Sequence, residues 1–215
     1  MKKRVAILIS GRGSNMVSLA EACRTPGYPA EVALVLSNRP DAAGLERARA
    51  AGLRTLVIDH KPFASRDAFD DAVDRALADA GAEIVCHAGF MRIQGDAFAR
   101  RWLGRQLNIH PSLLPSFKGL HPHKQALDAG VRISGCTVHF VTPDLDSGPI
   151  VAQAAVPVLP GDDVAALEAR ILSAEHTLYP LALKLVATGE ITMAGIAATP
   201  ASPVNQQAPL FSPAP

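Results

Sequence analysis

The chain has 215 residues, of which 48% are hydrophobic and 19% are charged, and its formal net charge is +1. This length supports one large domain with a substantial core. The near-zero charge and the lack of long Lys or Arg runs argue against nucleic acid as a partner, and no apolar stretch is long enough to cross a bilayer.

The N-terminus and the cysteines indicate the compartment. The basic residues 2–4 and the apolar run 5–9 are too short for a signal peptide and end without a cleavage-like site. The three cysteines are an odd number, widely spaced and inside apolar segments: Cys23, Cys86 and Cys136. We expect a reducing, cytoplasmic location without a disulfide framework, and a monomer or a homodimer that binds small molecules.

Strands and helices alternate along the first half of the chain. Apolar runs bounded by turn residues predict strands at 4–9, 31–36, 54–58 and 83–86. Helical periodicity predicts helices at 17–23, 41–51, 66–80 and 96–102. This order predicts an α/β fold: one domain with a mostly parallel twisted sheet, right-handed crossovers and helices on both faces.

The second half adds strands at 107–110, 133–141 and 150–158, and a helix at 122–128. A long helix capped by Asp162 or Asp163 should be kinked at Pro180. From residue 199 the sequence is rich in Pro, Ala and Gln and has no periodicity. We therefore expect a folded domain over 1–198 and a disordered tail over 199–215.

The glycine-rich turn 10–15 follows the first strand, with Ser14 or Asn15 expected to cap the next helix. Such a turn brings backbone N–H groups close to an anion, so a bound phosphate is favoured over a bare tight turn. It is not a dinucleotide fingerprint, because Met16 occupies the third glycine position and no acidic residue ends the second strand. A nicotinamide cofactor is therefore disfavoured.

Residues 87–93 form an apolar turn at the end of another predicted strand. This turn either forms a wall for a flat heteroaromatic ligand or packs Phe90, Met91 and Ile93 under the next helix. Because the carboxyl ends of parallel strands share one edge of a sheet, this loop should converge with the glycine-rich turn and the end of strand 107–110 on one cleft.

Asn108 and His110 lie on one face of the strand 107–110, which Pro111 ends. An amide can donate to the oxygen that becomes negative in acyl-type transfer, and a histidine can move a proton near neutral pH. The two residues are therefore a candidate catalytic pair, although both are also compatible with satisfied polar residues at a strand end. Asp146 in the later loop 142–149 is a candidate partner for His110, whereas Asp144 and Asp146 are equally compatible with ordinary turn residues.

Four histidines raise the possibility of a metal site: His110, His121, His123 and His139. His121 and His123 flank a proline at a helix start, so they do not share a helix face, and no cysteine lies nearby in sequence. We therefore expect no metal.

Several segments resemble the phosphoribosylglycinamide formyltransferases, folate-dependent enzymes of purine synthesis. They are SGRGSN, SNRPDAAGLERA, AGFMRI, LNIHPSLLPSFKGLHPHKQAL, GCTVHFVTPDLDSGPI and AEHTLYP, in order from about residue 5 to about residue 190. The resemblance implies the formyltransferase fold, with a Rossmann-like N-terminal half. It also implies formyl transfer from 10-formyltetrahydrofolate to the amino group of glycinamide ribonucleotide, without metal.

The resemblance also implies residue roles. The catalytic trio corresponds to Asn108, His110 and Asp146, and the ribonucleotide side to Gly13, Ser14, Asn15 and Glu175. The folate side corresponds to Arg66, Met91, Arg92, Ile93, Gln94 and Asn108. Cys86-His87, Gln94 and Ser116 depart from the residues usual in the family.

Two kinds of alternative remain. One is a related folate-dependent formyl hydrolase, or a formyltransferase that acts on another amine. The other is a non-catalytic nucleotide-binding module, against which the intact trio argues.

Overall fold

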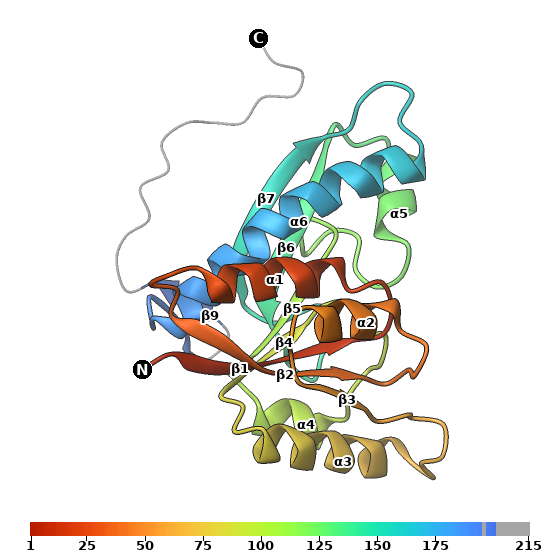
Figure 1. The fold of residues 1–215 in the computed structure, drawn as a ribbon. Coiled ribbons are helices and arrows are strands. Elements are labelled where there is room, and N and C mark those ends of the chain that lie inside the picture. The colour runs from red at the N-terminus through yellow and green to blue at the C-terminus, as the bar shows by residue number, and fades with distance from the viewer. Residues whose placement is uncertain (195–196, 201–215) are drawn as a thin grey trace.

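The structure is a computed structural model, and it describes residues 1–194 and 197–200. Seven strands form one sheet in the order β3-β2-β1-β4-β5-β6-β7 (Figure 1). Their bounds are β1 (Lys3–Ile9), β2 (Ala30–Ser37), β3 (Thr55–Val57), β4 (Ile84–His87), β5 (Gln106–His110), β6 (Ile133–Phe140) and β7 (Ile150–Pro157). Strands β1 to β5 run parallel, and β6 and β7 are antiparallel additions.

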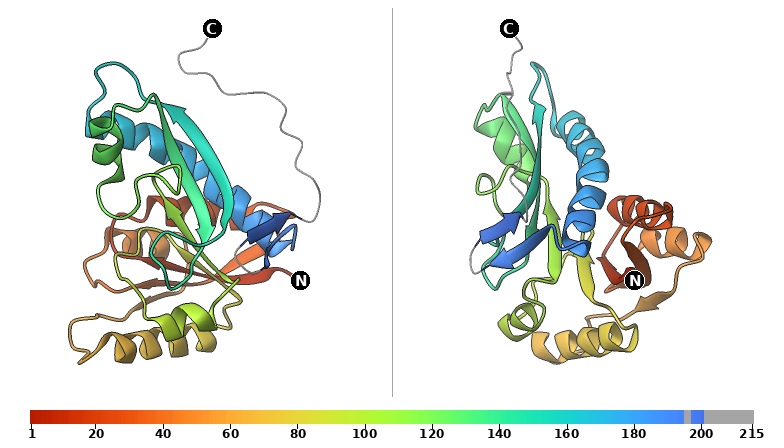
Figure 2. Two further views of the ribbon diagram at one scale, coloured as in Figure 1. Left: turned by 180° about the vertical axis from the view of Figure 1, so that it is seen from behind. Right: turned by 90° about the vertical axis from the view of Figure 1, so that its left-hand side faces the viewer.

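Helices cover both faces of the sheet (Figures 1 and 2). Their bounds are α1 (Ser14–Arg24), α2 (Ala43–Ala50), α3 (Arg66–Asp79), α4 (Asp96–Arg101), α5 (Pro122–Asp128) and α6 (Val164–Ala187). Val5, Ile7 and Ile9 of β1 pack with the apolar residues of α1, α2 and α6. Ala6 and Leu8 pack with those of α3 and α4, because successive side chains of a strand point to opposite faces. The predicted fold class is confirmed.

Two local predictions need correction or refinement. The N-cap of α1 is Gly13, with φ 70° and no side-chain capping bond, so neither Ser14 nor Asn15 caps the helix. A glycine fits there because it adopts a left-handed backbone without a Cβ penalty. Helix α6 begins after Asp163, whose side chain accepts from the N–H of Ala166, and it continues through Pro180 to its end.

The C-terminal region contains a two-stranded antiparallel ladder of β8 (Ile191–Ala194) and β9 (Ala197–Pro200). The domain boundary expected at residue 198 falls within β9, and residues 201–215 of the expected tail lie outside the described residues. Of the helices in the described part of the chain, none combines the length and apolar character that a membrane span requires.

The two faces of β5 carry different chemistry. Leu107 and Ile109 belong to the core beneath α6, whereas Asn108 and His110 alternate with them and face the opposite side. The buried hydroxyl of Tyr179 on α6 lies 3.0 Å from the carbonyl oxygen of His87 and 3.1 Å from that of Leu107. Helix α6 therefore holds β4 and β5 from the face opposite to Asn108 and His110.

We expect Gly135→Ala to destabilise the fold, because a Cβ at Gly135 would lie 1.9 Å from the carbonyl oxygen of Ala154 and 2.9 Å from Leu113 Cδ2. Overpacking of this kind costs about 1–3 kcal/mol or more. Urea denaturation measures the change in free energy of unfolding. Gly11→Ala is the control, since a Cβ there meets nothing within 4 Å. Equal stability of the two variants would contradict the packing described.

Candidate active site

The loops that follow β1 and β4 are hydrogen-bonded to one another at the carboxyl edge of the sheet. The N–H of Ser10 donates to the carbonyl oxygen of Gly89 at 3.1 Å, and the N–H of Met91 donates to Ser10 Oγ at 2.8 Å. The Ser10 hydroxyl donates to Asn38 Oδ1 at 2.6 Å. Since β5 is the neighbour of β4 in the sheet, three of the segments identified in the sequence meet at one edge.

Asn108 lies directly opposite His139 of β6. The Nδ1–H of His139 donates to the carbonyl oxygen of Phe140 at 2.9 Å, so its Nε2 is free to accept from Asn108 Nδ2 at 3.2 Å. Burial lowers the pKa of His139 and favours this neutral form. One N–H of the Asn108 amide is thereby fixed, and the second can point to a ligand.

His110 and Asp146 form a buried pair. The Nε2–H of His110 donates to the carbonyl oxygen of Phe117 at 2.9 Å, and Nδ1 lies 3.5 Å from Asp146 Oδ2. The other oxygen of Asp146 lies 3.7 Å from His139 Nε2. Asp146 is 9% exposed, whereas Asp144 is exposed. Of the two carboxylates weighed in the sequence, Asp146 is therefore the one beside His110.

Two loops cover this pair and are tied together. The N–H of Gly119 donates to Asp146 Oδ2 at 3.0 Å, and Lys118 Nζ donates to Ser147 Oγ at 2.6 Å. Phe117 and Asp146 have left-handed backbones, with φ of 56° and 46°. Non-glycine residues in this region cost about 1–3 kcal/mol each and concentrate at functional sites.

Gly13, Ser14 and Asn15, which the resemblance assigns to a ribonucleotide, lie at the start of α1. Gly13 packs against α2 so closely that a Cβ would lie 2.8 Å from Gly44 Cα. The next residue, Ser14, is half-buried, and Asn15 Nδ2 donates to Glu175 Oε2 of α6 at 2.7 Å. Burial raises the pKa of Glu175 to about 7, and the bond from Asn15 partly opposes this. The unpaired N–H groups of a helix start favour an anion here.

The loop 89–95 has both buried and exposed side chains. Phe90 is buried and makes an edge-to-face contact with the His87 ring, their centroids 5.5 Å apart. Met91 is 74% exposed and Ile93 is 59% exposed, so the alternative in which all three apolar residues pack under the next helix holds only for Phe90. Two exposed apolar side chains in this loop suit a flat apolar ligand.

The polar residues of this loop are held from α3. The N–H of Gly95 donates to Asp70 Oδ2 at 2.6 Å, and exposed Arg66 lies next to Gly95 at the start of α3. Arg92 Nε and Gln94 Nε2 are buried and have no hydrogen-bond partner among the described residues. Both atoms are N–H donors, and an acceptor group of a ligand or a water can pair with them.

The four histidines do not form a metal centre. His121 is exposed at the start of α5, while His123 is half-buried and burial lowers its pKa. Within residues 1–194 and 197–200, no three His, Cys, Asp or Glu side chains are arranged to hold a metal ion.

Sequence reasoning did not assign a site role to His139, although its alternation within 133–141 placed it on the face of Thr137. The signal that would have found it is the register of β5 on β6, which the sequence does not display.

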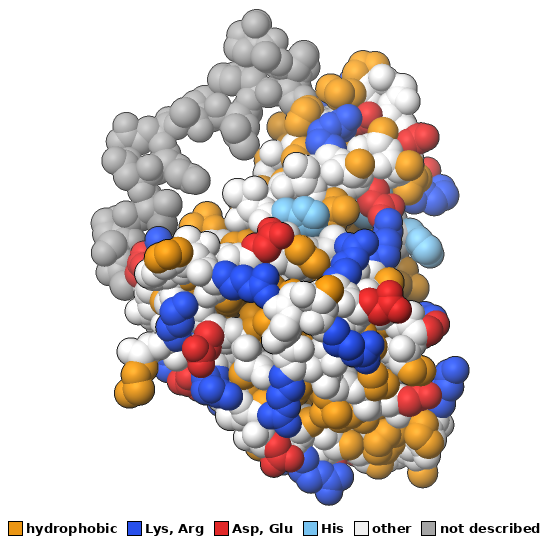
Figure 3. Space-filling view, in the orientation of Figure 1, with side chains coloured by type: hydrophobic (Ala, Val, Ile, Leu, Met, Phe, Trp, Pro, Cys, Tyr) orange, Lys and Arg blue, Asp and Glu red, His pale blue; other side chains and the backbone are white. Residues whose placement is uncertain are grey.

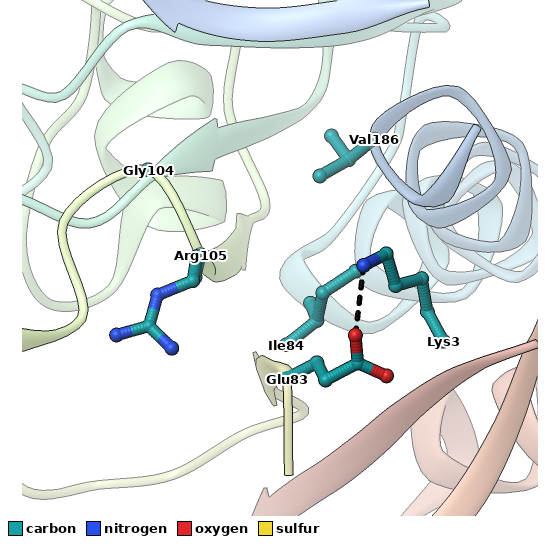
Figure 4. A pocket seen from close by; sticks show the side chains of 6 residues that line it. All are labelled: Lys3, Glu83, Ile84, Gly104, Arg105 and Val186. Carbon is teal, nitrogen blue, oxygen red and sulfur yellow. Dashed lines mark hydrogen bonds and ion pairs between the residues drawn. The ribbon is translucent and has the colours of Figure 1, made fainter. Parts of the chain in front are cut away.

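A small hollow of about 230 Å³ lies at the opposite, amino-terminal edge of the sheet (Figure 4). Lys3 and Glu83, which line it, form an ion pair of 2.7 Å. Because ligands of open parallel sheets bind at the carboxyl edge, this hollow is not the candidate site.

Basic and acidic side chains are interspersed over the face seen in Figure 3.

We expect Glu175→Gln to remove a pH-dependent loss of stability. The pKa of about 7 for Glu175 in the folded protein exceeds the ordinary glutamate pKa of 4.5. The native state therefore binds more protons than the unfolded state between these values, and its stability falls as pH rises through them. The effect is on the order of 3 kcal/mol. Urea denaturation at pH 5 and pH 8 measures the free energy of unfolding. The value for Glu175→Gln, relative to that of the wild type, should be higher at pH 8 than at pH 5.

Glu168→Gln is the matched control on the same helix, because Glu168 is 41% exposed and pairs with Arg12 at the surface. It should change stability by less than about 1 kcal/mol at both pH values. A Glu175→Gln variant that followed the wild type at both pH values would contradict the buried carboxyl.

Comparison with known proteins shows which family this chain resembles. Residues 3–183 match the family model described as Formyl transferase. The chain is 45% identical over 189 residues to phosphoribosylglycinamide formyltransferase of Escherichia coli, and the match covers 88% of this chain and 89% of that protein. It is 52% identical over 192 residues to the trifunctional purine biosynthetic protein adenosine-3 of Bos taurus. That match covers 89% of this chain but only 19% of the length of the Bos taurus protein.

Solved structures agree with the sequence comparisons. A glycinamide ribonucleotide transformylase from Symbiobacterium toebii superposes with a TM-score of 0.90 at 47% identity, covering 93% of this chain and 94% of that one. A phosphoribosylglycinamide formyltransferase from Brucella melitensis has a TM-score of 0.84 at 53% identity, covering 88% and 97%. On fold, on sequence and on the family model, the chain belongs to the formyl transferase family.

Proposed function

We propose that this chain transfers the formyl group of 10-formyltetrahydrofolate to the amino group of glycinamide ribonucleotide, a step of purine synthesis. The proposal is supported by the name of a relative that matches 88% of the chain. The observation that carries it is the buried cluster of Asn108, His110 and Asp146 at the end of β5. This cluster lies at the same edge of the sheet as the start of α1 and the apolar loop after β4.

Each member of the cluster has a separate chemical task. When bound, 10-formyltetrahydrofolate supplies the carbonyl carbon that the amine attacks, so a C–N bond forms and the bond to the carrier nitrogen breaks. The free N–H of Asn108 donates to the oxygen that becomes negative. His110 Nδ1 takes the proton that leaves the amine, and Asp146 stabilises the imidazolium that results. The proton finally replaces the formyl group on the carrier nitrogen.

The loop 91–95 fits a folate. Met91 and Ile93 present apolar surface for its ring system, and the buried unpaired atom Arg92 Nε is a donor for its polar groups. Gln94 belongs to the same loop and is bound to Gln106 of β5. On the other side, Gly13, Ser14 and Asn15 hold the phosphate through backbone N–H groups, and Glu175 faces the ribonucleotide. Arg66, exposed beside this loop, suits an anionic part of the folate.

We expect Asn108→Ala to lower kcat by about 10²–10³-fold, the usual effect of one lost oxyanion donor. His110→Ala should lower it by about 10²–10⁴-fold, as for a general base, and Asp146→Asn should lower it too. Asp144→Asn, in the same loop but exposed, is the control and should retain activity. A folate absorbance assay measures formyl transfer. Full activity in all three site variants would refute the assignment.

The same assay separates transfer from hydrolysis. Loss of the formyl group only when glycinamide ribonucleotide is present supports a transferase. Equal loss of the formyl group without the ribonucleotide would instead indicate a formyl hydrolase.

We expect Gly13→Ala to weaken ribonucleotide binding, because the new Cβ would clash with Gly44 Cα and displace the loop. The KM for the ribonucleotide should rise about tenfold or more, since this corresponds to only about 1.4 kcal/mol. Gly27→Ala is the control. Gly27 has a left-handed backbone like that of Gly13, with φ of 80° and 70°, so an alanine is strained at both positions, but a Cβ at Gly27 would meet nothing within 4 Å. An unchanged KM in Gly13→Ala would contradict the proposed phosphate loop.

A further inference from the structure

Three polar side chains form a buried chain behind the loop 91–95. They are His87 at the end of β4, Gln106 at the start of β5 and Gln94 within the loop. His87 is 6% exposed and Gln106 is fully buried. Gln106 Nε2 lies 2.6 Å from His87 Nε2, and it also donates to Gln94 Oε1. Buried polar groups cost stability unless they are paired, so the chain calls for a functional explanation.

The hydrogen-bonded row of His87, Gln106 and Gln94 begins next to Asn108. His87 is the register partner of Asn108 on β5, and Asn108 is the register partner of His139 on β6. The three residues therefore form one row across the sheet, and Gln106, two residues before Asn108, faces the same side. A side-chain contact thus joins the strand that carries Asn108 to the loop that faces the expected folate.

Its hydrogen-bond direction is fixed. Burial, with a smaller effect of His139, lowers the pKa of His87 to about 3, so the ring is neutral at working pH. Because Gln106 Nε2 is a donor, His87 Nε2 must accept, and the ring proton lies on Nδ1. Gln106 is therefore held by one acceptor in the core and one in the loop.

The loop has other anchors, but they hold its ends. Met91 is bound through its N–H to Ser10, and Gly95 is bound through its N–H to Asp70. Between them, the described contact of Gln94 with Gln106 is the one that ties a loop side chain to β5. The depth of the loop relative to Asn108 is thereby set by Gln94.

We propose that His87, Gln106 and Gln94 act as a positioning relay that sets the distance between the folate-binding loop and Asn108. The inference rests on the proposed function. The three residues are positioning residues, because they act through the loop and not on the reacting atoms.

The relay predicts non-additive effects. Replacing one member leaves its buried partners unpaired, whereas replacing all three by apolar residues leaves none unpaired and can be nearly neutral. Gln94 Nε2 and Gln106 Oε1 are already buried without partners among the described residues. The relay therefore has no second hydrogen bond that could compensate for a lost one.

The test compares His87→Leu, Gln106→Leu and Gln94→Leu with the triple variant. In each single variant the KM for 10-formyltetrahydrofolate should rise about three- to tenfold, the range expected for one lost buried hydrogen bond. The KM for the ribonucleotide should stay within about twofold, which is under 0.5 kcal/mol. The triple variant should recover most of the loss. Gln94→Leu changes only the loop, so it keeps the test valid if a core variant does not fold.

Tyr179→Phe is the matched control, because it removes a hydroxyl that contacts the backbone carbonyls of His87 and Leu107 but none of the three relay side chains. It should lower stability and leave the folate KM unchanged. Folate KM values that do not rise in the single variants, that rise together with the ribonucleotide KM, or that rise equally in Tyr179→Phe would overturn the relay.

Hydrogen exchange of residues 90–95 separates this inference from the proposed function, because it needs no substrate. Exchange in the single variants should be faster than in the wild type and in Tyr179→Phe. A wild type without formyl transfer would refute the proposed function, and the exchange result would then decide on the relay. Unchanged exchange in all single variants would refute the relay even in an active enzyme.

Discussion

The site depends on the burial of one carboxylate between two imidazoles. A buried carboxylate needs polar partners to be stable. The N–H of Gly119 donates to Asp146 Oδ2, and His110 Nδ1 and His139 Nε2 lie 3.5 and 3.7 Å from the two carboxylate oxygens. This requirement ties the loop after β5 to the loop after β6. It also requires β5 and β6 to pair in the register that brings Asn108 opposite His139. A change in that register would separate Asn108 from His139 and would displace Asp146, in the loop after β6, from His110.

The parallel half of the sheet brings the two proposed substrates to that cluster. Strands β1, β4 and β5 end at one edge, and Ser10 joins the loops of β1 and β4 by hydrogen bonds to Gly89 and Met91. The proposed phosphate loop and the exposed Met91 are thus parts of one connected rim. Positioning two reactants in this way can account for about 7–11 kcal/mol of a barrier, more than Asn108 or His110 can supply alone.

The sequence predicted what depends on local pattern. Alternation gave the strands, including the shared face of Asn108 and His110, and the order of elements gave the parallel sheet with helices on both faces. It did not predict what depends on contacts between distant segments. The role of His139 follows from strand register, and the choice of Asp146 over Asp144 follows from the fold of one turn. Gln106 lay just before the predicted strand 107–110 and carried no signal of a site role, and the capping role of Gly13 depends on its packing against Gly44.

The most direct test is a crystal structure of the chain with glycinamide ribonucleotide and an unreactive analogue of 10-formyltetrahydrofolate. The account predicts the phosphate at the start of α1 and the folate ring against Met91 and Ile93. It places the amine about 3–3.5 Å from the carbon that corresponds to the formyl group, with Asn108 Nδ2 within hydrogen-bond distance of the oxygen. Reacting ends that lie apart, or a carbonyl oxygen directed away from Asn108, would contradict it.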